Sequence, residues 1–138
     1  MKVLVRERVL TELDHVRLAT LSRRGLRARL PNSPGIDALL DDARVVPSRR
    51  VASDIVTMYS QVLLRFADDG SKRKLTLCYP QDAEPRFGFV SVLSPIGMSL
   101  LGQPVGAMVC WRSPDGSERA GHVDAVLYQP EASGDYTT

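Results

Sequence analysis

The sequence of 138 residues contains few of the side chains that carry covalent or metal chemistry. Its two cysteines, Cys78 and Cys110, lie in separate apolar runs. We therefore expect both to be small buried side chains rather than a disulfide or a metal site. Its two histidines, His15 and His122, are far apart and do not have the spacing of metal ligands. The sequence predicts no metal site and no cofactor.

Motifs that mark common enzymes are also missing. There is no Gly-x-x-x-x-Gly-Lys phosphate loop, no Gly-x-Gly-x-x-Gly dinucleotide motif and no Gly-x-Ser-x-Gly nucleophile motif. The acidic pair Asp41 and Asp42 falls in a predicted helix, where neighbouring side chains diverge by about 100° and form no ready chelate. We therefore predict that the protein is not an enzyme.

Long hydrophobic runs are absent as well. No stretch approaches the roughly 18 to 20 apolar residues that span a bilayer. The first six residues contain one short apolar burst broken by charges, which is unlike a signal peptide. We expect a cytoplasmic protein without a membrane partner.

Charge is distributed unevenly along the chain. Residues 1–50 carry 11 Lys and Arg against 6 Asp and Glu, whereas residues 51–138 carry 7 against 10. A basic N-terminal part on a mildly acidic body indicates two units with different roles.

The N-terminal part has the pattern of two short helices around a turn. Residues 11–30 are predicted to be helical, because Leu10, Leu13, Val16 and Leu21 recur near helical spacing. Thr11 is a suitable N-cap, with Asp14 three residues later as an imperfect capping-box partner. Residues 31–35 have the composition of a turn, and a second apolar face follows at Ile36, Leu39, Leu40 and Ala43. We expect an antiparallel helical hairpin, or short coiled coil, over residues 1–46.

The rest of the chain reads as strands and a single helix. Alternating apolar residues predict strands over residues 59–66, 74–79, 89–93, 107–112 and 119–128, with turns at residues 68–71 and 113–117. In the last strand, Val123, Ala125 and Leu127 are expected on one face. The predicted fold class is α+β: the hairpin, then a bent antiparallel sheet packed on one helix over residues 47–130, and a flexible tail over residues 131–138.

The stretch Val90–Gly106 is the most informative part of the sequence. Ser94 is a good N-cap and Pro95 suits the first helical position, where its missing N–H costs nothing. Gly102 is expected to end this helix with a positive φ angle. The stretch contains no nucleophile, base or metal ligand, so we expect it to present a surface.

This block, Ser-Pro-Ile-Gly-x-x-Leu-Leu-Gly followed by Val-Gly, resembles the C-terminal domain of Gre-type transcript cleavage factors, which enter the secondary channel of bacterial RNA polymerase. Residues 54–60 look like an early strand of the same domain, and residues 128–136 resemble the tail of the regulator of nucleoside diphosphate kinase (Rnk) family. The resemblance covers roughly residues 46–138 and implies an FKBP-like fold for the sheet.

The resemblance also implies sites. Leu93, Ser94, Pro95 and Ile96 match the region by which Gre C-terminal domains are thought to grip the channel rim of RNA polymerase, although Gre patterns can have an acidic residue where Leu93 stands. Next to the predicted turn lie Arg23, Arg24, Arg27 and Arg29, which are either a solvated helix end or a contact to an acidic protein rim or to phosphates.

Gre factors carry acidic residues at the hairpin tip that are thought to hold a catalytic Mg²⁺, whereas residues 29–35 here contain no carboxylate. The expected function is a monomeric transcription regulator of the Rnk type, which binds RNA polymerase and competes with Gre-type factors without stimulating transcript cleavage. Three alternatives stay open: an active Gre-like cleavage factor, a module that binds DNA or RNA, and an FKBP-type prolyl isomerase.

Overall fold

The structure, a computed structural model, describes residues 8–28 and 35–135, and for residues 24–28 and 35 it describes only the backbone. The helices are α1 (Glu12–Ala28), α2 (Gly35–Asp42) and α3 (Pro95–Leu100). The strands are β1 (Val9–Thr11), β2 (Arg44–Val46), β3 (Gln61–Phe66), β4 (Lys72–Cys78), β5 (Phe89–Ser91), β6 (Met108–Arg112) and β7 (Glu118–Tyr128). None of the described helices is both long and apolar enough to cross a bilayer.

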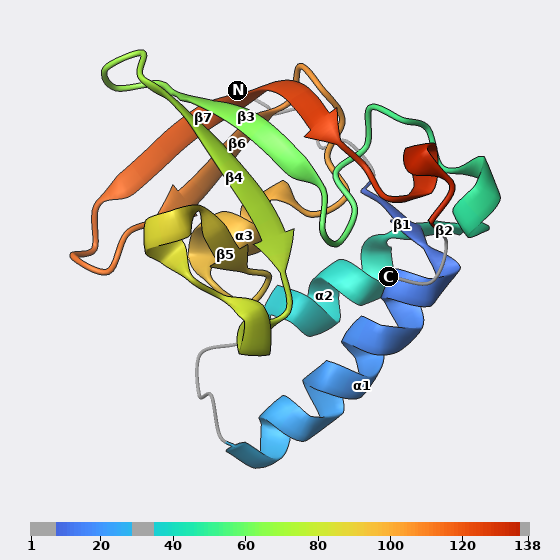
Figure 1. Ribbon diagram of the computed structural model, residues 1–138. Helices are drawn as coiled ribbons and strands as arrows, with labels where there is room; N and C mark the ends of the chain where they lie inside the picture. Colours follow the sequence, from blue (N-terminus) through green and yellow to red (C-terminus); the bar gives the residue numbers. More distant parts are fainter. Residues whose placement is uncertain (1–7, 29–34, 136–138) are drawn as a thin grey trace.

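Five strands form one curled sheet in the order β5-β4-β3-β7-β6, with α3 lying against it (Figure 1). The pairs β3–β4, β3–β7 and β6–β7 are antiparallel, as the sequence predicts. The pair β4–β5 is parallel, so the prediction of an antiparallel sheet was wrong at this edge. After β4, two turns of 3-10 helix at Pro80–Asp82 and Pro85–Phe87 carry the chain back before β5 begins. The FKBP-like assignment stays a prediction.

Strand β3 follows the predicted alternation, since Val62, Leu64 and Phe66 are all buried. Strand β7 does not, because its register against β3 shifts twice. Val123 pairs with Leu64 and is buried, but the next inward partner is Val126, and Leu127 is 45% exposed. The bulges in this pair change which residues face inward, so the expectation that Leu127 lies on the buried face was wrong.

Helix α1 begins where the sequence predicts. The Thr11 hydroxyl oxygen accepts a hydrogen bond from the Asp14 backbone N–H at 3.1 Å, which is the expected cap. The inward face is rotated from the predicted one, because Val16 is 62% exposed while Leu18 is fully buried. Asp14, expected in the cap, is itself buried and turned toward the body of the protein.

Helices α1 and α2 run antiparallel, in agreement with the predicted hairpin. His15 Nε2 lies 3.1 Å from the carbonyl oxygen of Leu40, and the Ser22 hydroxyl donates to Asp37. Helix α2 has only 8 residues, about two turns, so the pair is too short for an extended coiled coil. A parallel pairing of β1 with β2, which the sequence did not reveal, closes the base of the hairpin.

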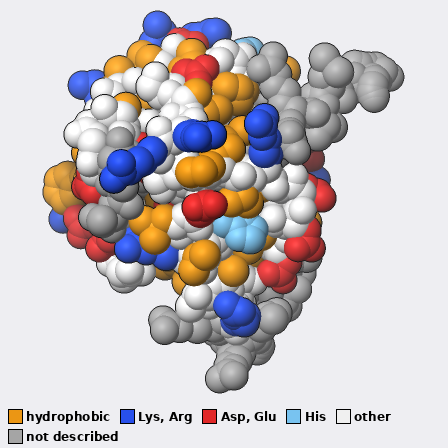
Figure 2. Space-filling model, turned by 90° about the vertical axis from the view of Figure 1, so that its right-hand side faces the viewer, with side chains coloured by type: hydrophobic (Ala, Val, Ile, Leu, Met, Phe, Trp, Pro, Cys, Tyr) orange, Lys and Arg blue, Asp and Glu red, His pale blue; other side chains and the backbone are white. Residues whose placement is uncertain are grey.

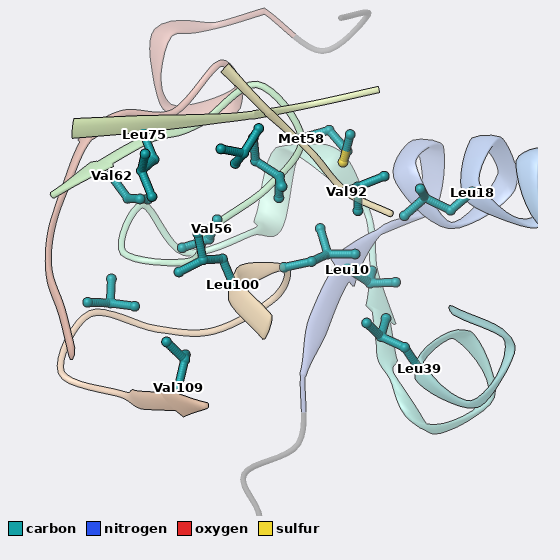
Figure 3. Packing of buried hydrophobic residues seen from close by; sticks show 14 of the residues in the cluster. Leu10, Leu18, Leu39, Val56, Met58, Val62, Leu75, Val92, Leu100 and Val109 are labelled. Carbon is teal, nitrogen blue, oxygen red and sulfur yellow. The ribbon is translucent and has the colours of Figure 1, made fainter. Parts of the chain in front are cut away.

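The hairpin and the sheet share one hydrophobic core. Leu10, Leu18 and Leu39 from the N-terminal part belong to the same buried cluster as Val92 and Leu100. In Figure 3, Leu10 lies between Leu100 and Leu39, so the core is continuous from α3 to α2 in this view. The hairpin is therefore packed on the body, as its marginal length requires.

The chain beyond β7 is held against the body as far as it is described. The segment Glu131–Ser133 forms a turn of 3-10 helix, and the Thr57 hydroxyl donates to the Glu131 carboxylate at 2.7 Å. Gln129 is buried and donates to the carbonyl oxygens of Ala52 and Ile55 at 2.8 Å. Residues 136–138 of the expected tail lie outside the described residues. The division of the chain near residues 46 and 130 stays a prediction.

Candidate functional site

The strand–turn–helix block around α3 has the geometry expected from the sequence. Ser94 is the N-cap of α3, and its hydroxyl oxygen accepts from the Gly97 N–H at 3.1 Å. The same hydroxyl donates to the carbonyl oxygen of Ser91 at 2.6 Å. Pro95 follows at the first helical position, and Gly102 has a φ angle of +78°. These bonds fix the loop between β5 and α3 in one conformation.

A close backbone approach holds the block together. A Cβ atom placed on Gly97 would lie 2.0 Å from the carbonyl oxygen of Ser91, so only glycine fits at this point of α3. The Ser91 side chain adds a bond, because its oxygen accepts from the Leu93 N–H at 3.0 Å. The loop is thus a rigid platform rather than a flexible connection.

The four residues proposed from the sequence as a partner contact lie together on this platform. Pro95 is exposed, whereas Leu93, Ser94 and Ile96 are half-buried. Leu93 and Ile96 pack against the core with part of their surface. What the platform offers to a partner is therefore the Pro95 ring with the outer edges of its three neighbours.

The opposite end of α3 is bound by a residue that sequence reasoning missed. The Arg8 guanidinium donates to the carbonyl oxygens of Met98 at 2.6 Å and of Leu101 at 2.8 Å. Backbone bonds tighten the same joint, since the Val9 N–H donates to the Gly102 carbonyl at 3.1 Å. Because β1 leads directly into α1, this joint ties the hairpin to the helix that carries the platform. The sequence gives no signal for a cap that is 90 residues away.

The arginines predicted near the hairpin tip are only partly described. Arg23 is exposed on α1, and Arg24 and Arg27 belong to the same helix, but their side chains are outside the description. Arg29 lies outside the described residues altogether. The C-terminal end of α1 lies well away from α3 in Figure 1, so the structure does not bring this set together with the platform.

Acidic residues do not gather into a metal site within residues 8–28 and 35–135, where no group of three or more potential ligands occurs. Asp37, the carboxylate nearest the predicted turn, accepts a hydrogen bond from the Ser22 hydroxyl. Asp41 and Asp42 are both exposed on α2. The described carboxylates of α2 are therefore either bonded to a neighbouring side chain, as Asp37 is, or exposed on the surface.

A second finding that the sequence did not signal is a buried carboxyl group at the start of α1. Asp14 is 1% exposed, and its Oδ2 accepts from the Met58 backbone N–H at 3.1 Å. Its Oδ1 is buried without a hydrogen-bond partner in the described part of the chain. Burial raises the pKa of Asp14 to about 7, and the nearby Glu131 carboxylate acts in the same direction.

The face of the molecule shown in Figure 2 carries both charged and hydrophobic side chains. On the face turned toward the viewer in Figure 2, Lys and Arg side chains lie mainly across the upper half, with hydrophobic side chains between them. Asp and Glu side chains lie mostly along the lower margins. Among the described side chains of this face, charges of both signs are therefore present.

Comparisons with known proteins agree with the geometry of the body. Residues 51–128 match the family described as "Transcription elongation factor, GreA/GreB, C-term". The matched range includes the whole five-stranded sheet and α3.

Two curated relatives extend this result. The "Regulator of nucleoside diphosphate kinase" of Escherichia coli strain K12 is 36% identical over 128 residues, which cover 93% of this chain and 94% of the relative. The transcription elongation factor GreA of Solidesulfovibrio magneticus is 30% identical over 100 residues, 72% of this chain and 61% of that protein.

Among solved structures, a GreA/GreB elongation factor from Nitrosomonas europaea is similar, with a TM-score of 0.72 and 30% identity. The match covers 88% of this chain and all of that one, so it includes N-terminal residues as well as the sheet. The relatives are named as regulators or elongation factors and not as catalytic enzymes.

Proposed function

Because the chain belongs to the family of regulators of nucleoside diphosphate kinase, which share the GreA/GreB C-terminal domain, we propose that it is a transcription regulator that binds RNA polymerase. It docks through the platform formed by Leu93, Ser94, Pro95 and Ile96 on the rim of the secondary channel. The hairpin of α1 and α2 then lies at the channel entrance, where it competes with Gre-type factors.

The observation that carries this proposal is the fixed, exposed Pro95 on the domain that the family shares. The Ser94 cap and the close approach at Gly97 hold the loop before any partner arrives, so docking requires little ordering of the chain. Pro95 has no backbone N–H to donate, and its side chain lies on the surface. A substitution at this position can therefore change the contact with a partner without disturbing the fold.

We propose further that the protein does not stimulate transcript cleavage. At 1.5 Å per residue, the 17 residues of α1 extend about 26 Å, a short reach for a probe. The seven residues at 29–35 contain no Asp or Glu, whereas oxygen ligands are what Mg²⁺ prefers. A tip of this composition occupies the channel without bringing metal ligands to it.

The test is binding to core RNA polymerase, measured by fluorescence anisotropy with a Gre-type factor as competitor. The informative variant is Pro95→Glu, because an acidic residue is favourable in the first turn of a helix and should leave the fold intact. Pro114→Glu, on the exposed turn between β6 and β7, is the matched control. We expect at least a tenfold loss of affinity, about 1.4 kcal/mol, for Pro95→Glu alone.

Other outcomes would redirect the proposal. Equal binding by both variants would remove the platform from the interface, and absence of binding by the unmodified protein would reject polymerase as the partner. Stimulated cleavage in a stalled elongation complex would instead establish an active Gre-like factor. Binding to free RNA that falls steeply with salt and depends on Arg23, Arg24, Arg27 and Arg29 would favour the nucleic-acid alternative.

The name of the Escherichia coli relative also ties the proposal to nucleoside diphosphate kinase. A pull-down with that kinase, beside transcript measurements in a deletion strain, separates a direct contact from an effect through transcription. We propose that the protein acts as a monomer, which light scattering at the concentrations of the binding assay tests directly.

A further inference from the structure

A cleft of about 450 Å³ lies between α1 and the body, away from the platform at α3. Val16, Arg17 and Thr20 of α1 form one wall. Tyr59, Tyr79 and Gln81, which flank β3 and β4, form the other. The volume lies within the range of sites that bind small molecules. Neither the sequence motifs nor the proposed docking surface involves this cleft.

The Tyr79 hydroxyl and the Arg17 side chain meet in this cleft. Tyr79 is 8% exposed, and its hydroxyl oxygen lies beside the Arg17 side chain, which interacts with it. Burial raises the pKa of Tyr79, so the hydroxyl keeps its proton and remains able to donate. A protonated hydroxyl and a guanidinium side by side can both donate to one acidic group of a ligand.

The neighbouring tyrosine is held in a strained backbone conformation. Tyr59 has a φ angle of +67°, the only positive value among the described residues other than glycine. Its N–H donates to the Leu77 carbonyl at 2.6 Å, and the turn around it is closed by a bond of 3.0 Å from the Ser60 N–H to the Thr57 carbonyl. Strain of this kind persists where surrounding bonds enforce it, and it is concentrated at functional sites.

The strained turn places two aromatic rings side by side. The centroids of the Tyr59 and Tyr79 rings are 5.7 Å apart, with their planes tilted by 58°. The Tyr59 hydroxyl donates to Asp82, which fixes the ring from its outer end. With Val16 opposite, the cleft offers apolar and aromatic surface to a flat molecule.

Arg17 supplies the charge. It is exposed on α1 at the wall of the cleft, and a guanidinium recognises carboxylate or phosphate groups through paired hydrogen bonds. Thr20 and Gln81 add uncharged polar groups nearby. We infer that this cleft is a binding site for a small planar aromatic molecule that carries an acidic group, with the ring against Tyr59 and Tyr79 and the acid on Arg17.

The test is nuclear magnetic resonance of the full-length ¹⁵N-labelled protein, titrated to millimolar concentration with three probes: 4-hydroxybenzoate, indole-3-acetate and adenosine 5′-monophosphate. We expect at least one probe to shift the amide signals of Thr20, Tyr59 and Gln81. 4-Hydroxybenzyl alcohol, indole-3-ethanol and adenosine, which lack the acid, should each bind more weakly than the corresponding charged probe. The absence of shifts at these residues with all three probes would overturn the inference.

Two variants sharpen the result. Arg17→Gln should weaken binding of the responding probe by about tenfold or more, the effect of removing one charge-assisted contact. Arg23→Gln changes an exposed arginine of the same helix outside the cleft and should leave binding unchanged. Thr20→Trp should fill the space and abolish binding, with circular dichroism as the check on folding. Equal weakening by the two arginine variants would show nonspecific charge attraction and reject the site. None of these readouts depends on RNA polymerase.

Discussion

Replacing Asp14 by asparagine should stabilise the protein above neutral pH and have little effect in acid. The pKa of Asp14 is raised from its ordinary value of 3.8 to about 7, chiefly because the group is buried. A carboxyl group with a raised pKa binds its proton more tightly in the folded state, so its favourable contribution is complete below about pH 4 and is lost as the pH rises to about 7. Asparagine resembles the protonated acid in shape and never becomes charged.

The structure sets the magnitude. Raising the pKa from 3.8 to about 7 means that ionisation of Asp14 lowers the free energy of unfolding by at most about 4 kcal/mol, since one pKa unit corresponds to about 1.36 kcal/mol. Asparagine keeps an oxygen for the Met58 N–H, as the protonated acid does, so this bond is common to the two neutral groups. Its amide also needs an acceptor in a site where Oδ1 has no partner. We expect a net gain of about 2 kcal/mol at pH 8.

The assay is urea unfolding followed by circular dichroism at pH 5 and pH 8, for the unmodified protein and for Asp14→Asn. The two proteins differ only at residue 14, so the change in their stability difference between the two pH values reports on the Asp14 carboxyl group and its surroundings. Asp41→Asn, on the exposed side of α2, is the control and should change stability by less than about 0.5 kcal/mol at either pH. A variant that is less stable than the unmodified protein at pH 8 would refute the reasoning.

Three further predictions follow from the contacts of α3 and from the cysteines. Gly97→Ala should destabilise the protein by about 2 kcal/mol or more in thermal unfolding, because its Cβ would meet the Ser91 carbonyl at 2.0 Å; an unchanged midpoint would contradict this. Arg8→Ala should lower the free energy of unfolding by about 1–3 kcal/mol in urea, whereas a smaller effect would mean that solvent replaces its two bonds. Cys110 should react with a thiol reagent in the native protein and Cys78 only in urea, since Cys110 is exposed and Cys78 is buried with a raised thiol pKa.

Local sequence signals predicted the parts of the fold that local chemistry decides. Thr11 and Ser94 both cap helices, because a hydroxyl before an apolar run satisfies free N–H groups wherever the helix lies. The turn signals at residues 68–71 predicted the tight turn between β3 and β4, where Gly70 has a φ angle of +74°. The alternation along β3 also held, since one face of that strand is buried over its whole length.

The features that depend on long-range pairing were beyond the reach of such signals. The bulges of β7 exchange the roles of Val126 and Leu127, and nothing in the alternation of β7 itself marks where they occur. Cys110 was expected to be buried, but on β6 at the edge of the sheet it faces outward. Asp14 looked like part of a helix cap, and only the fold brings the Met58 N–H to its carboxylate.

The same difference between local and long-range features separates the two candidate sites. The platform at residues 93–96 is contiguous in sequence, so a local motif was enough to propose it, although its role as a partner contact stays a prediction. The cleft draws on α1 and on the ends of two strands, and its strained Tyr59 has no sequence signal because non-glycine residues with positive φ follow from tertiary bonds.

Helix α3 connects the two halves of the proposed mechanism. Its first turn carries Pro95 for docking, and the carbonyl groups at its other end are held by Arg8, four residues before α1 begins at Glu12. Six residues of helix span only about 9 Å, so a partner that binds the first turn of α3 also fixes the direction of the chain at its last turn.

In the proposed complex, Arg8→Ala should therefore leave docking through Pro95 nearly intact while weakening competition with a Gre-type factor, because the hairpin would no longer be held at the channel entrance. Loss of both properties together would mean that the joint supports the platform itself, and an unchanged competition would mean that the shared core around Leu10 positions the hairpin without it.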